Sequence, residues 1–373
     1  MYINTMNISK IFQRYFKGIF IKIFFLIYGR IVPLYEHNNH DCKITKIKKI
    51  ILDDNTHYDL PNCIYEIFNG RIYTDFVEHV AIIKKNKILP NISYQQVNGE
   101  LKDVEFNKAV YSGTPRFMKN FDGTMLSLVQ GASGNNYFHF LFDIITKLKL
   151  CSQIIPLDKI DFFYVPGKMQ WQIKIFELFG IPEKKLIDSH IYRHVKAKNI
   201  IAIDHPWYQK GYVQEEIINL PTWSILWLRE KFLKYSKKFQ CANKIFIDRS
   251  DSKFNHCKLI NNDEVMEYLL SQGYQSYKVG ELDFFEQIYL FSNAKIIIGP
   301  HGAAFTNIIF SRSRANIVEI IPEDHPSKKC KRISKILNLK YKRVEQARIF
   351  NGGGGSGDML VKIDALHKIL QEI

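Results

Sequence analysis

The chain has 373 residues, of which 46% are hydrophobic and 24% are charged, and its formal net charge is +15 at pH 7. This length and composition predict a globular protein of two domains and exclude a disordered or fibrous chain. The charge indicates anionic partners, such as phosphates, nucleic acid or an acidic membrane surface, although codon bias toward Lys and Asn would also contribute to it. None of the six cysteines forms a C-x-x-C pair, so the sequence favours a reducing compartment over a zinc site or a disulfide framework.

Residues 10–32 predict an amphipathic helix. Its apolar residues recur at three- and four-residue spacing: Ile11, Phe12, Tyr15, Phe16, Ile19, Phe20, Ile23, Phe24 and Ile27. Lys22 interrupts this run, and the apolar stretch that remains is far shorter than the about 20 residues that cross a bilayer. No small-residue cleavage site follows, which argues against a cleaved signal peptide. We expect a basic helix that lies in the membrane interface, and the alternatives are a helix docked on the protein's own core and a signal-anchor.

The middle of the chain changes from short strand-like segments, found from 42 to 120, to strands that alternate with helices, which predict a parallel sheet. The expected strands are 50–52, 71–73, 80–83, 161–165, 198–203, 244–247, 274–279, 296–298, 316–320 and 341–344. The expected helices are 169–180, 221–239, 263–270, 283–291, 328–339 and 360–373. The stretch 351–357, NGGGGSG, is typical of a flexible linker.

In the segment 131–151, small polar residues lead into an expected helix that carries a polar stripe on an otherwise apolar surface. Asn136, His139, Asp143 and Lys147 follow one another at spacings of three, four and four, so they share one face. His139 and Asp143 could form a hydrogen-bonded pair in which the carboxylate raises the basicity of the imidazole, as a general base requires. The alternative is a satisfied structural network within the core.

Basic residues follow the strand at 244–247. Arg249 comes directly after this strand, at the sheet edge where open α/β sheets bind ligands, and a guanidinium there suits a phosphate. Lys253, His256 and Lys258 continue the same loop, and the alternative is a basic loop on the surface.

The stretch KIIIGPHGAAFTN, residues 295–307, predicts a buried strand, a tight break and a helix start. Gly299, Gly302 and Ala303 leave room for a ligand to approach the backbone, and the first N–H groups of a helix suit a phosphate. His301 supplies a polar ring at this turn. Small residues would also allow a helix to pack closely on a sheet, which is the alternative. Glu319 stands within the next strand, an unusual position for a carboxylate.

Three blocks of the sequence resemble, in order, the motifs of family 61 glycosyltransferases. The first block, NYFHFLFDIITKL, resembles an N-Y-x-H-W-x-x-D helix. The second block is formed by KIFIDRSDS and KLINNDEV, and it resembles a strand that ends in Ser-Arg and is followed, after a gap, by Arg-x-x-Asn-Glu. The third block, FFEQIYLFSNAKIIIGPHGAAFTN, resembles an E-Q…G-x-H-G-A-G-L-x-N block. The matching positions include Asn136, Tyr137, His139, Asp143, Arg249, Asn261, Glu264, Glu286, Gln287, Gly299, His301, Gly302, Ala303, Asn307 and Glu319. The chain departs from the pattern at Asp248 (usually Ser), Lys258 (usually Arg), Asn262 (usually Glu) and Ala304-Phe305 (usually Gly-Leu).

This resemblance implies an α/β fold of the GT-B type, with two Rossmann-like domains facing a cleft, after the N-terminal amphipathic helix. The expected parts are a membrane-associating segment at 1–40, an acceptor-side domain at 41–206, a nucleotide-sugar-binding domain at 207–346, and a linker and helix at 347–373 that pack back on the first domain. The implied activity is inverting glycosyl transfer, with no cofactor besides the nucleotide-sugar substrate and with no metal.

The resemblance and the residues together assign roles. His139 or Asp143 is the expected base. The donor phosphates are expected at Arg249, Lys258, His301, Gly302, Ala303 and Asn307, and sugar or ribose hydroxyls at Asn136, Glu286 and Glu319. The acceptor would be a glycan or glycolipid in capsule or lipopolysaccharide-type synthesis, handled in the cytoplasm at the inner face of the membrane, without nucleic acid.

Two other functions stay open. One is a non-catalytic nucleotide- or sugar-binding protein with a decayed transferase site, for which Asp248 in place of Ser is the hint. The other is a metal-dependent phosphoesterase that uses His139, His205 and His301. These histidines lack any H-x-H or H-x-x-E-H spacing, so the sequence disfavours it.

Overall fold

The computed structural model describes residues 5–36, 41–52, 54–75, 79–131, 133–208, 210–250, 257–349 and 357–373. Lys253, His256, the glycine-rich residues 351–356 and the side chains of 5–15 lie outside this description. Contacts divide the chain into two compact units, the first comprising Met1–Ile50 and Asp59–Tyr212 and the second Ile51–Tyr58 and Val213–Ile373. Each unit contains a sheet and helices, so the expected mixed α/β fold is confirmed at this level.

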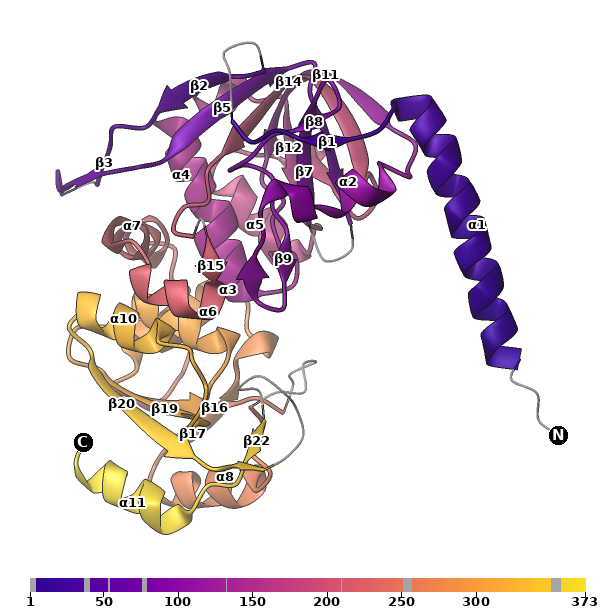
Figure 1. Ribbon diagram of the computed structural model, residues 1–373. Helices are drawn as coiled ribbons and strands as arrows, with labels where there is room; N and C mark the ends of the chain where they lie inside the picture. Colours follow the sequence, from indigo (N-terminus) through magenta and orange to yellow (C-terminus); the bar gives the residue numbers. More distant parts are fainter. Residues whose placement is uncertain are drawn as a thin grey trace. The chain divides into compact units, whose positions relative to one another are not determined.

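The helix α1 (Thr5–Tyr28) confirms the helix expected near the N-terminus (Figure 1). Its last turn docks on the first unit, because Phe24 is only 4% exposed and its ring lies edge-on to Phe117 with 5.2 Å between centroids. The hydroxyl of Tyr28 accepts a hydrogen bond from the Met118 N–H at 3.0 Å. Gly29 ends the helix at φ 77, a left-handed conformation that suits glycine. No helix in the described part of the chain is long and apolar enough to cross a membrane.

The first unit is built on one large mixed sheet. Its strands are β1 (Val32–Pro33), β2 (Lys43–Lys46), β5 (Cys63–Phe68), β6 (Arg71–Thr74), β7 (Val80–Lys84), β8 (Lys87–Ile88), β11 (Lys119–Ser127), β12 (Phe162–Val165), β13 (Leu186–Asp188) and β14 (His194–Ile203). They follow the order β1-β8-β7-β6-β14-β11-β12-β13, and β5 pairs with β14 and β2. Smaller strands of this unit are β9 (Gln96–Val97), β10 (Glu100–Leu101) and β15 (Gly211–Tyr212). The paired strands β3 (Lys49–Ile51) and β4 (His57–Asp59) each contain residues of both units.

The direction of these strands corrects the expectation of a Rossmann-like first domain. Strands β11 to β14 are mutually parallel, as the alternating pattern predicts. By contrast, β5 and β6 pair antiparallel with β14, and β6, β7 and β8 form an antiparallel meander. The short turns between these strands leave no room for the crossover helix that a parallel pair needs.

The helical segment after β11 is continuous but not uniformly α-helical. It consists of α3 (Tyr137–His139), a π-helical stretch η2 (Phe140–Ile145) and α4 (Thr146–Ser152). Every residue of the π-helical stretch is buried, which confirms the buried helix with a polar stripe. The wider turn shifts the side chains that follow it, and such turns often occur at functional sites.

The remaining helices of the first unit are short. They are α2 (Lys108–Ser112), α5 (Gln170–Glu177) and the 3-10 turns η1 (Val104–Phe106), η3 (Leu157–Lys159) and η4 (Glu183–Lys185). Helix α5 confirms the helix expected at 169–180.

The second unit contains a five-stranded parallel sheet in the order β17-β16-β18-β19-β20. Its strands are β16 (Lys244–Asp248), β17 (Gln275–Lys278), β18 (Ile296–Pro300), β19 (Asn316–Pro322) and β20 (Lys340–Gln346), each within a few residues of its expected position. In chain order this arrangement is 2-1-3-4-5, a doubly wound sheet whose strand order reverses between β16 and β18.

Helices cover both faces of this sheet. They are α6 (Val213–Glu216), α7 (Thr222–Leu233), α8 (Asn262–Ser271), α9 (Phe284–Asn293), α10 (Lys329–Ile336), α11 (Ile363–Gln371) and the 3-10 segments η5 (Ile217–Asn219), η6 (Val279–Glu281) and η7 (Ala303–Phe310). Helices α8 and α11 lie on one face and α10 on the other (Figure 1). A short hairpin of β21 (Arg348–Ile349) and β22 (Asp358–Met359) precedes α11.

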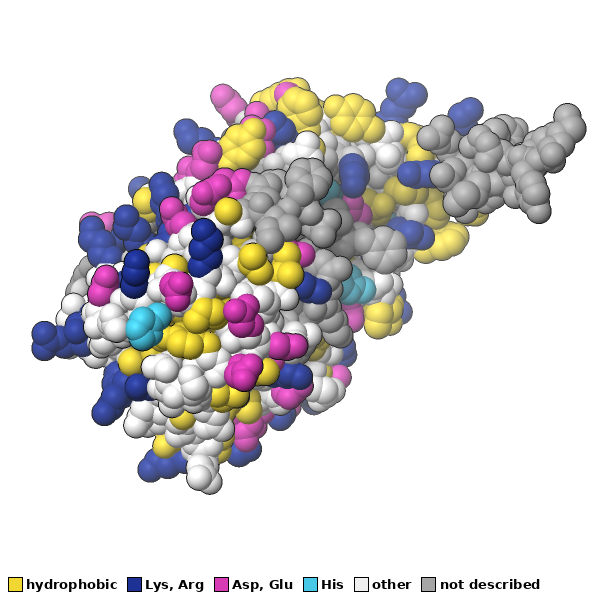
Figure 2. All heavy atoms as spheres, turned by 90° about the horizontal axis from the view of Figure 1, so that it is seen from below, with side chains coloured by type: hydrophobic (Ala, Val, Ile, Leu, Met, Phe, Trp, Pro, Cys, Tyr) yellow, Lys and Arg dark blue, Asp and Glu magenta, His cyan; other side chains and the backbone are white. Residues whose placement is uncertain are grey.

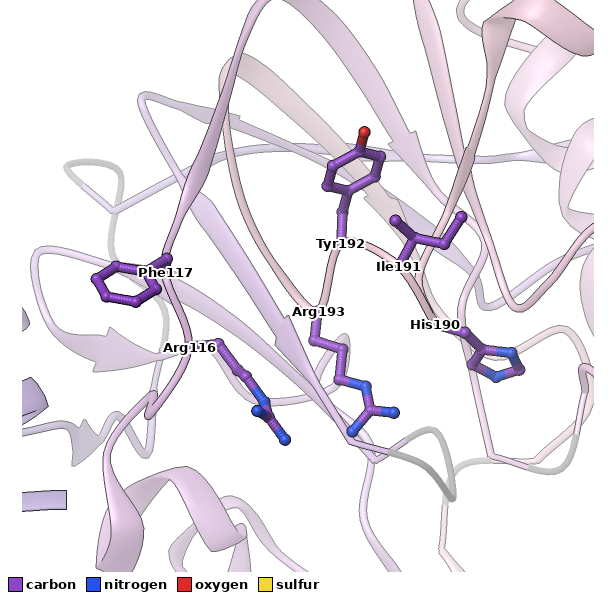
Figure 3. A pocket seen from close by; sticks show the side chains of 6 residues that line it. All are labelled: Arg116, Phe117, His190, Ile191, Tyr192 and Arg193. Carbon is purple, nitrogen blue, oxygen red and sulfur yellow. The ribbon is translucent and has the colours of Figure 1, made fainter. Parts of the chain in front are cut away.

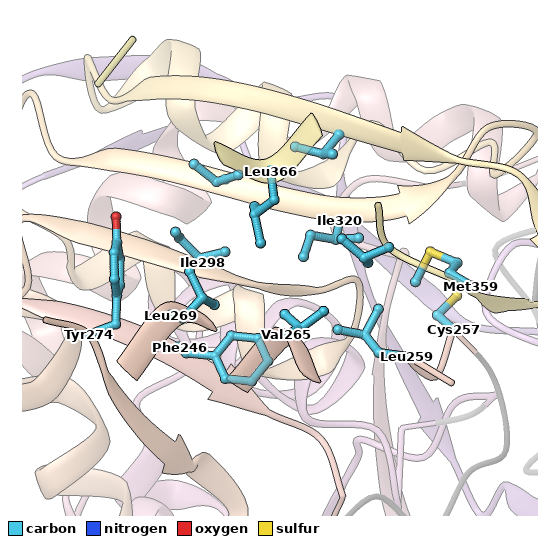
Figure 4. Packing of buried hydrophobic residues seen from close by; sticks show 13 residues of the cluster. Phe246, Cys257, Leu259, Val265, Leu269, Tyr274, Ile298, Ile320, Met359 and Leu366 are labelled. Atoms are coloured by element: carbon cyan, nitrogen blue, oxygen red, sulfur yellow. The ribbon is translucent and has the colours of Figure 1, made fainter. Parts of the chain in front are cut away.

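The expectation that the C-terminal helix packs on the first domain is wrong. Leu366 of α11 lies in one buried cluster with Phe246, Ile298 and Val265 of the second unit (Figure 4). The amphipathic face of α11 therefore completes the core of the sheet that precedes it in the chain.

Candidate functional site

A first polar cluster lies at the carboxyl ends of two neighbouring parallel strands of the first unit. The helical segment 137–152 follows β11, and His205 and Trp207 follow β14. These strands are adjacent although β12 and β13 stand between them in the chain, so the strand order reverses here. Open α/β sheets bind ligands at such a position.

The expected pair of His139 and Asp143 is formed. His139 Nδ1 lies 2.7 Å from Asp143 Oδ2. The His139 side chain is 17% exposed, whereas the Asp143 side chain is 2% exposed. Because Nδ1 faces the carboxylate, Nε2 is the ring nitrogen that remains for a ligand.

Two residues beyond β14 hold Asp143 in place. The indole Nε1 of Trp207 donates to Asp143 Oδ1 at 2.7 Å, and His205 Nε2 lies 3.7 Å from Oδ2. The backbone N–H groups of Trp207 and Tyr208 both donate to His205 Nδ1, so the ring proton of neutral His205 is on Nε2. Burial alone would raise the pKa of Asp143, but His139 and His205 hold that pKa well below its ordinary range.

A buried lysine adjoins this group. Lys147 donates to the side-chain oxygen of Gln130 at 2.6 Å, and burial lowers the pKa of Lys147 to about 8. Asp204 accepts from the Cys63 N–H at 2.8 Å, and burial raises the pKa of Asp204. The polar stripe that the sequence predicts on the helix therefore continues inward through Lys147 to Gln130. The cleft interpretation of the stripe applies to His139, whereas the structural interpretation applies to Lys147.

Asn136 caps the helix. Its side-chain oxygen accepts from the N–H groups of Phe138 and His139 at 3.0 and 3.4 Å. This contact fixes the first turn and hence the direction of the His139 ring. The side-chain oxygen of Asn136 is thus engaged in capping the helix, and its NH2 group is the part of the side chain that could bind a substrate hydroxyl.

A second polar cluster lies in the second unit, where the strand order reverses between β16 and β18. Arg249 follows β16 directly and His301 follows β18. His301 Nδ1 lies 2.6 Å from Glu319 Oε1. The carboxylate of Glu319, within β19, therefore binds the ring of His301 at the end of the neighbouring strand β18. The other Glu319 oxygen accepts from the Tyr341 hydroxyl at 2.6 Å.

Glu319 is ionised in this setting. Burial acts to raise its pKa, but His301, Tyr341 and Cys330 bind the carboxylate and lower the pKa to about 2. Burial lowers the pKa of His301, so the neutral ring donates its Nδ1 proton to the carboxylate.

Two cations lie against the turn after His301. Arg249 Nη1 donates to the His301 carbonyl, and Lys329 Nζ donates to the Gly302 carbonyl at 3.0 Å. A Cβ atom on Gly302 would lie 2.8 Å from Arg249 Cζ, so glycine lets the guanidinium lie over this turn. Gly302 has no side-chain cap for the 3-10 helix η7, whose first N–H groups lack intrahelical partners. Cations and N–H groups together form a site suited to an anion.

His325 extends this cluster. Its ring centroid lies 4.2 Å from that of His301, and burial lowers its pKa to about 3. Arg343 Nη2 donates to the His325 carbonyl at 2.8 Å and so fixes the loop after β19.

Several expected donor-site residues have other contacts. Glu286 completes the capping box of α9 and binds Lys237 at 2.7 Å. Asn307 is fully buried and donates to Gln287 at 3.0 Å. The backbone carbonyl of Lys258 accepts from the Met359 N–H at 2.8 Å. Ala303 begins η7 beside the turn.

Asp248, the departure that favours a decayed site, has a local partner. Its two carboxylate oxygens accept from the N–H and the hydroxyl of Ser250 at 2.8 and 2.9 Å. The carboxylate thus shapes the turn that carries Arg249.

The sequence reasoning missed Trp207, Gln130, Lys329, His325, Tyr341 and Cys330. For three of these residues, Trp207, Gln130 and His325, their position after an expected strand is a signal in the sequence. Trp207 and Gln130 follow the ends of β14 and β11 by a few residues, and His325 follows β19 in the same way. All carboxyl ends of a parallel sheet meet at one edge, so each such loop is a candidate.

Among the described residues, no group of three or more His, Cys, Asp or Glu side chains is arranged to hold a metal ion. The comparison with family models matches residues 137–318 to the model described as Glycosyltransferase 61. No curated protein matches the chain. The matched segment includes His139, Asp143, Arg249 and His301 and ends one residue before Glu319.

Proposed function

Because residues 137–318 form a family 61 glycosyltransferase domain and the chain is thus a glycosyltransferase, we propose that it moves a sugar from a nucleotide-sugar donor to a glycan or glycolipid acceptor with inversion. The observation that carries this proposal is the cationic turn at the reversal point of the second sheet, where Arg249 and Lys329 face the start of η7.

The donor's diphosphate binds at this turn. Glycosyl transfer leaves a nucleoside diphosphate, whose new negative charge must be stabilised. Arg249, Lys329 and the first N–H groups of η7 supply positive charge and hydrogen-bond donors there without a metal ion. The amide of Gly302 is a further donor, while Glu319 binds Nδ1 of His301 and orients its ring beside this turn.

Proton transfer belongs to the first unit. The acceptor oxygen attacks the anomeric carbon, the bond from that carbon to the diphosphate oxygen breaks, and the hydroxyl proton passes to His139 Nε2. We assign the base to His139 rather than Asp143, because both carboxylate oxygens are occupied and the side chain is 2% exposed. Asp143 stabilises the imidazolium that forms.

The GT-B-like arrangement of two domains around one cleft remains part of this proposal, as does a role in surface polysaccharide synthesis at the cytoplasmic side of the membrane. Both follow from the family resemblance and from the division of roles between the two clusters.

The test is transfer by the purified chain with a panel of UDP-, GDP- and CMP-sugars and glycan acceptors. We expect release of one nucleoside diphosphate and a product of inverted configuration, with activity retained in EDTA. Saturation-transfer NMR on the same panel detects binding independently of turnover. Binding without transfer or donor hydrolysis would favour the non-catalytic alternative, and loss of activity in EDTA would overturn the metal-independent mechanism.

A further inference from the structure

Two histidine rings lie side by side at the carboxyl end of the second sheet. His301 follows β18 and His325 lies in the loop after β19, and their ring centroids are 4.2 Å apart with 50° between the ring planes. Charge alone does not single out a ligand site, because over the face drawn in Figure 2 Lys and Arg side chains alternate with Asp and Glu. The position of the proton on each of two adjacent rings is more specific, since it determines which groups they bind.

The fold makes His325 a hydrogen-bond donor at Nε2. Its Nδ1 accepts from the Ser327 N–H at 3.1 Å, so Nδ1 carries no proton. Burial lowers the pKa of His325 to about 3, so the ring is neutral at pH 7 and its single proton is on Nε2. The His325 N–H donates to the Pro322 carbonyl at 3.0 Å, and Arg343 Nη2 donates to the His325 carbonyl at 2.8 Å. These backbone contacts hold the residue that carries the donor.

His301 has its proton on the other ring nitrogen. Its Nδ1 donates to the ionised carboxylate of Glu319 at 2.6 Å. Burial lowers the pKa of His301, so the ring is neutral and Nε2 carries a lone pair instead of a proton. The two adjacent rings therefore offer one acceptor, His301 Nε2, and one donor, His325 Nε2–H.

Both Nε2 atoms remain for a ligand. In the part of the chain that the structure describes, the hydrogen bonds of the two rings are made by their Nδ1 atoms. The described buried side-chain atoms that lack a partner do not include either Nε2. His301 is 8% exposed and His325 is 9% exposed. Each Nε2 therefore reaches the surface of the second unit while the rest of its ring is held within the fold.

A hydroxyl group matches this combination. It donates its proton to His301 Nε2 and accepts from His325 Nε2–H, whereas a phosphate oxygen only accepts and would meet the lone pair of His301. The carboxylates expected to bind hydroxyls have other partners. Glu286 caps α9, and both oxygens of Glu319 accept from neighbouring side chains. The two rings thus supply the hydroxyl contacts that these carboxylates do not offer.

A hollow of about 460 Å³ in the first unit has a different lining (Figure 3). Its described lining contains one histidine, His190, together with Arg116, Phe117, Ile191, Tyr192 and Arg193. One imidazole does not provide the donor and the acceptor of two neutral rings. The hollow is therefore not a second example of the arrangement at His301 and His325.

We propose that His301 and His325 together bind a hydroxyl group of the nucleotide sugar, beside the turn that holds its diphosphate. This inference rests on the proposed function. It assigns a binding role to His325, which lies beyond the segment 137–318 matched by the family model. The hydroxyl belongs either to the ribose or to the transferred sugar, since both are attached to the diphosphate.

The test is titration calorimetry of the wild type and His325→Phe. The ligands are pyrophosphate, UDP and GDP, the 2′-deoxy and 3′-deoxy forms of both nucleotides, and the UDP- or GDP-sugar that is active in transfer. We expect the variant to bind the hydroxyl-bearing ligand about threefold to tenfold more weakly, the loss of one hydrogen bond between neutral groups. Pyrophosphate, which has no such hydroxyl, should bind equally well to both proteins.

The two sources of the hydroxyl give different results. If it is a ribose hydroxyl, His325→Phe weakens the binding of UDP or GDP, and one deoxy form binds equally weakly to the wild type and the variant. If it belongs to the transferred sugar, the variant binds UDP and GDP like the wild type and loses affinity only for the nucleotide sugar. His367→Phe, at an exposed position of α11, is the matched control and should bind every ligand like the wild type.

Two outcomes would overturn this inference and leave the proposed function intact. One is equal affinity of the wild type and His325→Phe for every ligand, and the other is a loss of pyrophosphate binding as large as that of the nucleotide. Absence of binding by every diphosphate would instead overturn the proposed function and this inference together.

A measurement on the wild type keeps the inference testable if His325→Phe does not fold, which circular dichroism shows. Nitrogen-15 NMR of histidine-labelled protein reports which ring nitrogen carries the proton. We expect the proton on Nε2 of His325 and on Nδ1 of His301. The opposite position in either ring would remove the matched donor and acceptor and overturn the inference.

Discussion

The two histidine–carboxylate pairs, His139–Asp143 in the first unit and His301–Glu319 in the second, share one geometry but differ in their surroundings. In each, the ring Nδ1 faces a buried carboxylate oxygen, at 2.7 and 2.6 Å. In each, the pair lies at the carboxyl end of a parallel strand where the strand order reverses. The same local chemistry therefore arises twice from the same topological rule.

The surrounding charges separate their roles. Asp143 has two histidines as neighbours, His139 and His205, and histidine is the side chain that most often transfers a proton in enzymes. Glu319 has a neutral His301, and the turn beside it carries the permanent charge of Arg249 together with Lys329. The first environment suits the transfer of a proton, whereas the second suits the binding of an anion. A histidine–carboxylate pair therefore has no fixed function until its neighbouring charges are known.

The largest effect that would sharpen this contrast is expected from His139→Ala. Removing a general base should lower kcat about 10²–10⁴-fold. Donor affinity should stay unchanged, because we propose that the diphosphate binds at the other cluster. Steady-state kinetics and donor titration measure the two quantities separately. His367→Ala, an exposed histidine of α11, is the matched control, and a His139→Ala variant with full activity would rule out this residue as the base.

Glu319→Gln tests whether the second pair is held by an ionised carboxylate. The folded pKa of Glu319 is about 2, below its ordinary value of 4.5. A lowered pKa contributes stability that is complete above pH 4.5 and is lost as the pH falls toward 2. This contribution is about 3 kcal/mol in the free energy of unfolding. Urea unfolding at pH 7 and pH 4 should therefore show a smaller pH dependence in the Gln variant than in the wild type. Equal pH dependence in both would contradict the ionised state.

How far the sequence predicts these sites depends on the range of the interaction. The i,i+4 spacing of His139 and Asp143 on one helix predicts their contact, because helical geometry alone brings them together. The contact between His301 and Glu319 joins residues from different strands. It depends on the register of β18 and β19, which pairs Gly299 with Glu319 and Pro300 with Ile320.

The residues that escaped prediction are those whose position depends on packing between elements. Lys329 begins α10, and its sequence context is an ordinary Lys-rich helix start. Only the placement of α10 beside η7 brings its amine to the Gly302 carbonyl. Conversely, Glu286 matches the family motif but caps α9, because Asp283 three residues earlier offers the local partner of a capping box. Strand positions were predictable from hydrophobic runs, but the antiparallel pairing of β5 and β6 with β14 is a non-local choice.

Arg249→Ala tests the anion site directly. A hydrogen bond between charged groups is worth about 1.5–3 kcal/mol, so nucleoside diphosphate affinity should fall about tenfold to hundredfold. Titration calorimetry with the nucleoside diphosphate of the active donor measures it. Lys335→Ala, an exposed cation of α10, should leave the affinity unchanged. If the two variants bind equally well, the turn at His301 does not hold the diphosphate.

Gly302→Ala should give the smallest and most selective effect. The φ of Gly302 is 173°, extended backbone that alanine also adopts, so the backbone itself tolerates the change. The new Cβ would lie 2.8 Å from Arg249 Cζ and Nε, and the flexible guanidinium must shift away from the turn. We expect a loss of diphosphate affinity of about threefold to tenfold, near 1 kcal/mol, with the thermal midpoint almost unchanged.

Gly299→Ala is the matched control for this variant. Its Cβ would meet Ile247 Cβ at 2.7 Å and the Ile247 carbonyl oxygen at 3.1 Å, atoms of the adjacent strand that cannot move freely. Overpacking there should destabilise the fold by about 1–3 kcal/mol. Gly302→Ala could instead lower the thermal midpoint as much as Gly299→Ala does and leave the diphosphate affinity unchanged. In that case Gly302 would serve only the packing of η7 on the sheet. The small residues of this turn would then have their structural interpretation alone.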